Sequence, residues 1–113
     1  MTRNEWLENF EAYKTADAAF RKAHATLCAM EEAAGTDDMD DAAFDAFYET
    51  GEAKELAAKA GDHGRLRAGL LKKLYTAAPE FVPAEVGLDF AAAAGRVVWM
   101  EKIVGLVAKG LAA

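Results

Sequence analysis

Apolar residues recur along this chain at three- and four-residue intervals, and no window shows the sustained alternation that is typical of a strand. Near the N-terminus, helical spacing places one set of side chains on a single face: Trp6, Phe10, Tyr13, Phe20, His24, Leu27 and Cys28. We expect this face of a helix over about 3–33 to pack into a core, with His24 as a satisfied core histidine. Such a helix is about 46 Å long and a compact globule of this length about 34 Å across, so the pattern predicts an elongated bundle or a projecting helix.

Glycines and prolines punctuate the rest of the helical pattern. Asp37 or Asp38 is expected to cap the second helix, and a change of phase after it predicts a break or kink at Thr50–Gly51. A short stiff connector is expected at Pro79–Pro83. The pattern as a whole predicts an all-α fold, an elongated bundle of four to five helices in a single domain over 1–113, with helices at about 3–33, 38–50, 52–60, 64–78 and 83–110.

The predicted final helix carries apolar residues on two sides. One stripe runs along its whole length: Val86, Phe90, Ala93, Val97, Met100, Val104, Val107 and Leu111. A second stripe of Trp99, Ile103 and Leu106 lies on the far side. A helix that is apolar on both sides needs cover on both sides. This helix is therefore either the central one of the bundle, or Trp99, Ile103 and Leu106 form an oligomer interface, and the sequence leaves both interpretations open.

The composition narrows the class of protein. A chain of 113 residues with 53% hydrophobic residues can bury a core without disulfides or a metal. The single cysteine, Cys28, leaves no internal disulfide framework and fits a reducing, cytoplasmic compartment. The N-terminus has no apolar signal core, and charged residues interrupt the longest apolar runs near the C-terminus. We expect a cytoplasmic protein with no membrane partner.

The net charge of −6 is unevenly distributed. Residues 31–55 carry ten acidic groups and one lysine, whereas residues 1–30 are balanced and residues 56–113 have an excess of three basic groups. Within the predicted second helix, Asp38, Asp41, Asp45 and Glu49 fall in a sector of about 80°. We call these four residues the acidic stripe, and they are the candidate partner-binding residues.

Two interpretations of the acidic stripe stay open. Carboxylates near a helix N-terminus offset the helix dipole and keep one face solvated, which needs no partner. Carboxylates at these spacings also repel one another by a few tenths of a kcal/mol per pair, which helix propensity alone would not select. The stripe is then a surface for a basic protein, with charges that imitate the phosphates of nucleic acid. Calcium is a weaker alternative because 37–41 lacks the alternating ligands and internal glycine of an EF-hand loop.

Other reactive side chains point to no site. Asp17, His24 and Cys28 have the chemistry of a nucleophile triad, but they share one helix and nothing marks an oxyanion hole. Zinc at His24 and Cys28 would need two more ligands, for which only Asp62–His63 is an obvious source. The basic residues of 61–73 are expected to pair with the acidic helix, so direct nucleic-acid binding is not expected. No catalytic residue, cofactor or metal is predicted.

These observations favour a non-enzymatic, acidic helical module that binds proteins. In the sharpest form of this hypothesis, the acidic stripe blocks a nucleic-acid-binding protein through its basic surface, as anti-defence proteins of mobile elements do. The alternative hypothesis is structural: a homo-oligomer, such as a homodimer, or a small helical subunit of a larger assembly held through the C-terminal helix.

Overall fold

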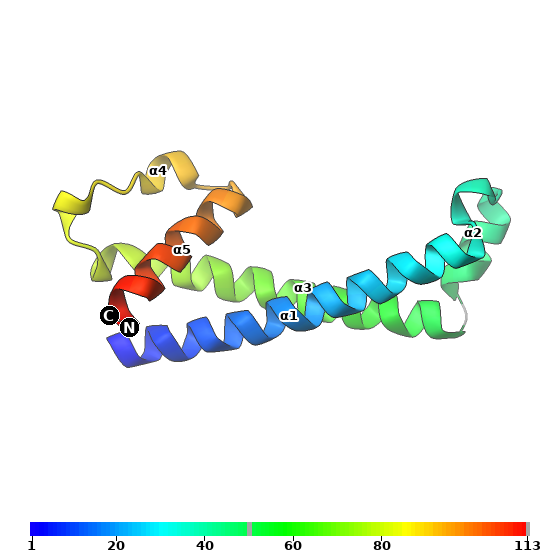
Figure 1. Ribbon diagram of the computed structural model, residues 1–113, viewed down its shortest axis with the longest axis horizontal. Helices are drawn as coiled ribbons and strands as arrows, with labels where there is room; N and C mark the ends of the chain where they lie inside the picture. The colour runs from blue at the N-terminus through cyan, green and yellow to red at the C-terminus, as the bar shows by residue number, and fades with distance from the viewer. Residues whose placement is uncertain (50, 113) are drawn as a thin grey trace. The chain divides into compact units, whose positions relative to one another are not determined.

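The computed structural model describes residues 1–49 and 51–112, and every regular element within them is helical (Figure 1). The elements are α1 (Arg3–Ala34), η1 (Thr36–Asp38), α2 (Asp41–Glu49), α3 (Gly51–Ala77), η2 (Ala78–Phe81), η3 (Ala84–Val86), α4 (Phe90–Ala93) and α5 (Val97–Ala112), where η marks a 3-10 helix. The prediction of an all-α fold is confirmed.

The described chain falls into two compact units. The terminal unit contains residues 1–14 and 68–113, and the middle unit contains residues 15–67. Whether the chain acts as one domain over 1–113 stays a prediction.

The long first helix is confirmed, but its buried face differs from the prediction near its C-terminal end. Its buried residues are Trp6, Tyr13, Ala16, Ala23 and Leu27. These positions follow a seven-residue repeat, about 3.5 residues per turn, which keeps a contact stripe straight along a long helix. His24 and Cys28 each lie one position beyond this stripe and are exposed. The prediction that they belong to the core is wrong.

The helices predicted over 52–60 and 64–78 form one continuous helix, α3. Gly61 and Gly64 do not break it, although a helical glycine costs about 1 kcal/mol relative to alanine. Gly64 lies against the ring of Phe20, where a Cβ atom would approach within 3.2 Å. Packing in the middle unit therefore offsets the weak propensity. The break before α3 is found at Gly51, which has a φ of 68°, while Thr50 lies outside the described residues.

The helix predicted over 83–110 begins at Val97 instead, as α5. Gly87 and Gly95 have φ angles of 71° and 76°, which end helical runs on either side of α4. The Asp89 carboxylate accepts a hydrogen bond of 2.9 Å from the Ala92 N–H and so caps α4. The long apolar stripe is therefore split, and Val97 at its break is exposed rather than packed.

Trp6 stands at the centre of the terminal unit. Its side chain is fully buried, its indole N–H donates to the Leu74 carbonyl at 3.0 Å, and its ring stacks on Phe10. α5 packs into the same core through Val104 and Val107. The Arg3 guanidinium donates to the Leu111 carbonyl, which fastens the start of α1 beside the end of α5 (Figure 1). This packing determines which face of α5 is exposed.

A charged cluster connects α1 to α3 in the middle unit. Asp17 accepts hydrogen bonds from Arg67 at 3.0 Å and from Arg21 at 2.9 Å. The Arg67 guanidinium also lies 4.0 Å from the centre of the Phe20 ring. Burial by itself raises the pKa of Asp17, but the hydrogen bonds and positive charges of the two arginines lower it below its ordinary value. The cluster is a structural feature that stabilises the ionised carboxylate.

Candidate interaction surfaces

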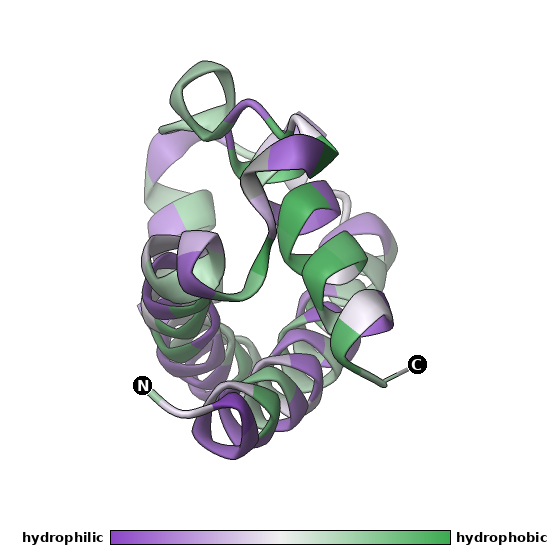
Figure 2. Ribbon diagram, turned by 90° about the vertical axis from the view of Figure 1, so that its left-hand side faces the viewer, coloured by the Kyte–Doolittle hydropathy of each residue, from purple (hydrophilic) through white to green (hydrophobic). Residues whose placement is uncertain are grey.

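The second apolar stripe predicted for the C-terminal helix is largely exposed to solvent. Trp99 is 54% exposed and Leu106 is 56% exposed, whereas Ile103 is 7% exposed and belongs to the core. Ile103 lies about 40° around the helix from Trp99, on the side of the buried Val107. The structure therefore separates Ile103 from the other two predicted residues. Trp99 and Leu106 lie on one exposed face of α5, and much of the α5 ribbon has the hydrophobic colour in Figure 2.

Two lysines accompany these apolar side chains. Lys102 and Lys109 are exposed, and the Lys102 ammonium lies 5.8 Å from the centre of the Trp99 ring. The carboxylate in the described part of α5, Glu101, is partly buried. We call Val98, Trp99, Lys102, Leu106 and Lys109 the α5 face. Its lysines were not among the predicted site residues, although their spacing from Trp99 and Leu106, three residues in each case, was available as a signal.

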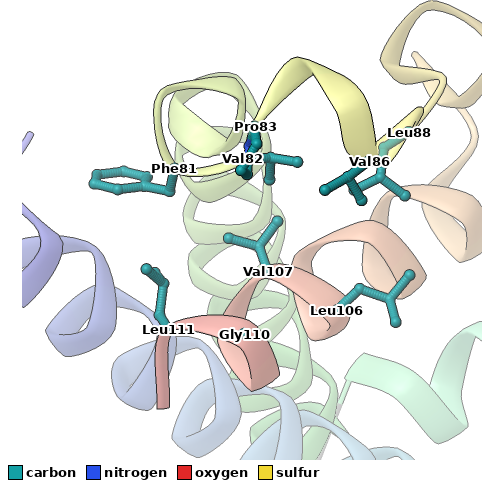
Figure 3. Close-up of a pocket in the computed structure, with 9 residues that line it drawn as sticks. All are labelled: Phe81, Val82, Pro83, Val86, Leu88, Leu106, Val107, Gly110 and Leu111. Atoms are coloured by element: carbon teal, nitrogen blue, oxygen red, sulfur yellow. The ribbon is translucent and has the colours of Figure 1, made fainter. Parts of the chain in front are cut away.

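A pocket of about 330 Å³ opens beside the α5 face (Figure 3). Its walls are apolar side chains from residues 81–88 on one side and from α5 on the other. Val107 points into the space between them, and Leu106 lies at its edge (Figure 3). The sequence pattern does not reveal this pocket, because the pocket requires residues 81–88 to be separate from α5, whereas the apolar spacing predicted a continuous helix.

The acidic stripe is fully on the surface. Asp38 lies in η1 and the other three residues lie on α2, and all four are exposed. None of them forms an ion pair within the described residues. The predicted cap at Asp37 or Asp38 is wrong because α2 begins later, and the Asp40 carboxylate accepts from the Ala43 N–H at 2.8 Å. The capping hydrogen bond therefore explains the position of Asp40 but not that of the acidic stripe.

The described part of α2 has no buried residue, and Phe44 on it is 42% exposed. The Tyr48 hydroxyl lies beside the Glu31 carboxylate of α1. Burial, hydrogen bonding to Glu31 and its negative charge raise the pKa of Tyr48 to about 12. A helix of nine residues is too short to be stable alone, and α2 buries no residue, so its unit stabilises it only weakly.

The reactive side chains of the middle unit do not assemble into a triad. Cys28 Sγ lies 3.6 Å from His24 Nε2, but Asp17 binds two arginines instead of His24. The His24 ring stacks on Phe20, with ring centres 5.6 Å apart. Within residues 1–49 and 51–112, no three carboxylate, imidazole or thiol side chains are grouped to hold a metal ion.

The two arginines of α3 form ion pairs within the middle unit. Arg67 binds Asp17 of α1, and Arg65 forms an ion pair with Asp62 on its own helix. The prediction that they pair with the acidic helix is wrong for these two arginines. Lys72 and Lys73 are exposed in the terminal unit.

Comparison of the chain with protein-family models, with curated proteins and with solved structures gives no match. In the described part of the chain, no helix combines the length and the apolar character needed to cross a membrane.

Proposed function

We propose that this protein is a non-enzymatic helical module that binds another protein chain through the α5 face. The observation that carries the proposal is the exposure of Trp99 and Leu106 on a helix whose opposite side is core. Tryptophan has a large apolar surface, and exposing more than half of it to water is unfavourable unless a partner covers it. Trp is also the residue type most enriched among those that dominate binding energy at interfaces.

The pocket beside the α5 face supports the same proposal. Interfaces concentrate their binding energy where a side chain of one partner fills an apolar pocket of the other. Leu106 belongs both to the α5 face and to the pocket wall, so one bound chain can cover both. The function that follows is that of a subunit held in an assembly through its C-terminal helix.

A photo-cross-linking side chain placed at Leu106 tests the proposal directly. Irradiation should attach the protein to its partner, and the mass of the product should identify the attached chain. The control carries the same side chain at Lys73, an exposed position on α3. A yield at position 106 no higher than at position 73 would contradict the proposed function.

A second candidate function rests on the acidic stripe, whose four exposed carboxylates form no ion pair within the described residues. Here the protein competes with nucleic acid for a basic protein surface. The test is displacement of a labelled DNA duplex from an arginine-rich peptide. The variant that replaces the stripe with Asn and Gln should lose this displacement, and equal activity of the variant and the wild type would exclude this candidate.

A further inference from the structure

The chemistry of the α5 face restricts what can bind it. Its apolar residues are bordered by Lys102 and Lys109, both exposed, whereas Glu101, the acid among the described α5 residues, is partly buried. A matching partner therefore presents an apolar anchor with carboxylates beside it. A second α5 is a poorer match, because the charges at the exposed positions of this face are all positive, and like charges at an interface are destabilising.

The chain itself contains a surface with the required chemistry. The exposed positions of α2 carry Asp41, Asp45 and Glu49 and no basic residue. Phe44 is also partly exposed, and it lies about 60° around the helix from Asp41. The α2 surface thus has an aromatic anchor with carboxylates to one side of it, Asp41 at about 60° and Asp45 at about 100° around the helix, and this chemistry complements an apolar stripe that carries lysines.

The charged residues span similar lengths of the two helices. Lys102 and Lys109 are separated by about 10 Å along α5, and Asp41 and Glu49 by about 12 Å along α2, at about 1.5 Å per residue, with Glu49 about 140° around α2 from Phe44. The pocket of about 330 Å³ has room for the Phe44 ring, since apolar cavities of about 150 Å³ bind benzene.

We propose that α5 of one copy binds α2 of a second copy of this chain. Phe44 of the second copy contacts Leu106 at the mouth of the pocket, and the carboxylates beside it face the two lysines of the α5 face. This inference rests on the proposed function, because it names the occupant of the α5 face. Each copy has one surface of each kind, so two reciprocal contacts close a dimer and one-way contacts extend a chain of copies.

Charge reversal tests the proposal without relying on one variant. The first variant combines Lys102→Glu with Lys109→Glu, and the second combines Asp41→Lys with Asp45→Lys. Each reversed variant has like charges on its two surfaces, whereas a mixture of the two variants restores opposite charges at both contacts. Sedimentation equilibrium from about 10 µM to about 1 mM covers the affinity expected for a small, partly polar contact. The control reverses the exposed Lys72 and Lys73.

The expected result has three parts. The wild type and the control associate, each reversed variant alone dissociates at least about tenfold more readily, and the mixture regains wild-type association. Phe44→Ala should also weaken association at least about tenfold, because it removes the anchor while keeping every charge.

Three outcomes would overturn the inference. A wild-type mass of one chain throughout the concentration range excludes the second copy, whereas the cross-link at Leu106 still tests the proposed function independently. Association that persists in the Asp41/Asp45 variant but is lost in Trp99→Ala keeps α5 as an interface and rejects α2 as its occupant. Flotation with vesicles of phosphatidylcholine and about one-quarter phosphatidylserine, if lost in the Lys102/Lys109 variant while no protein association occurs, would assign the α5 face to anionic lipid.

Discussion

Replacing Asp17 with Asn tests the charged cluster that connects α1 to α3. The substitution keeps the side chain's size and removes the charge that both arginines bind. The Arg67 contact is only 22% exposed on each side, whereas the Arg21 side chain is 65% exposed. A partly shielded, charge-assisted hydrogen bond contributes about 1–2 kcal/mol, and an exposed i, i+4 pair contributes about 0.3–0.5 kcal/mol.

We therefore expect Asp17→Asn to lower the free energy of unfolding by about 1–2 kcal/mol at pH 7, which for a chain of this size lowers Tm by about 4–8 °C. Urea denaturation followed by far-UV circular dichroism measures the loss. The matched control is Asp45→Asn, the same chemical change at an exposed carboxylate that has no ion pair within the described residues.

The pH dependence adds a second, independent test. The folded-state pKa of Asp17 lies below its ordinary value of 3.8, so the stabilisation is fully present above that value and is lost as the pH falls through the folded-state pKa. The difference between wild type and Asp17→Asn should be constant from pH 7 to about pH 5 and should shrink in stronger acid. Equal stability of Asp17→Asn and Asp45→Asn at pH 7, or a difference that grows in acid, would refute this account of the cluster.

Three further predictions concern other parts of the chain. Gly69→Ala, in open space on α3, should stabilise the protein by about 0.5–1 kcal/mol in urea denaturation, whereas Gly64→Ala should gain less or destabilise because its Cβ meets a ring at 3.2 Å; equal gains would contradict this. Tyr48→Phe should cost about 0.5–1.5 kcal/mol below pH 10, a cost that disappears as the pH rises through about 12; a tyrosine absorbance titration in which the variant loses no late-ionising component would contradict it. Acrylamide should quench Trp99 but not Trp6, so Trp99→Phe should remove the quenchable fluorescence; quenching that survives this change would show that Trp6 is accessible to solvent and would contradict its burial.

Helical periodicity was sufficient to predict the fold class and the long first helix. The hydrogen bonds of a helix are local, so a period near 3.6 without alternation determines the element type wherever the segment is long. The exposure of the acidic stripe was also predictable, because adjacent carboxylates are rarely buried without partners. Trp99 and Leu106 were singled out for the same kind of reason, since they lie away from the main apolar stripe.

Periodicity could not predict where helices end at glycine. Gly61 and Gly64 permit helix or turn equally in sequence terms, and the fit of Gly64 against Phe20 makes the helical state favourable. Gly87 and Gly95, by contrast, end helices, because their positive φ angles separate α4 from its neighbours. The pocket follows from those two breaks, so no local pattern in the sequence marks it.

The sequence by itself determined the helical class, the local excess of carboxylates and the presence of more apolar surface on the last helix than one core face requires. Only the tertiary structure decided that Ile103 is core while Trp99 and Leu106 are exposed. A rotation of about 40° around α5 separates Ile103 from Trp99, and the side that becomes buried depends on where α5 meets Trp6 and Leu74 of the terminal unit. Contacts between residues so distant in sequence carry no periodic signal, which is why the exposed α5 face follows only from the packed structure.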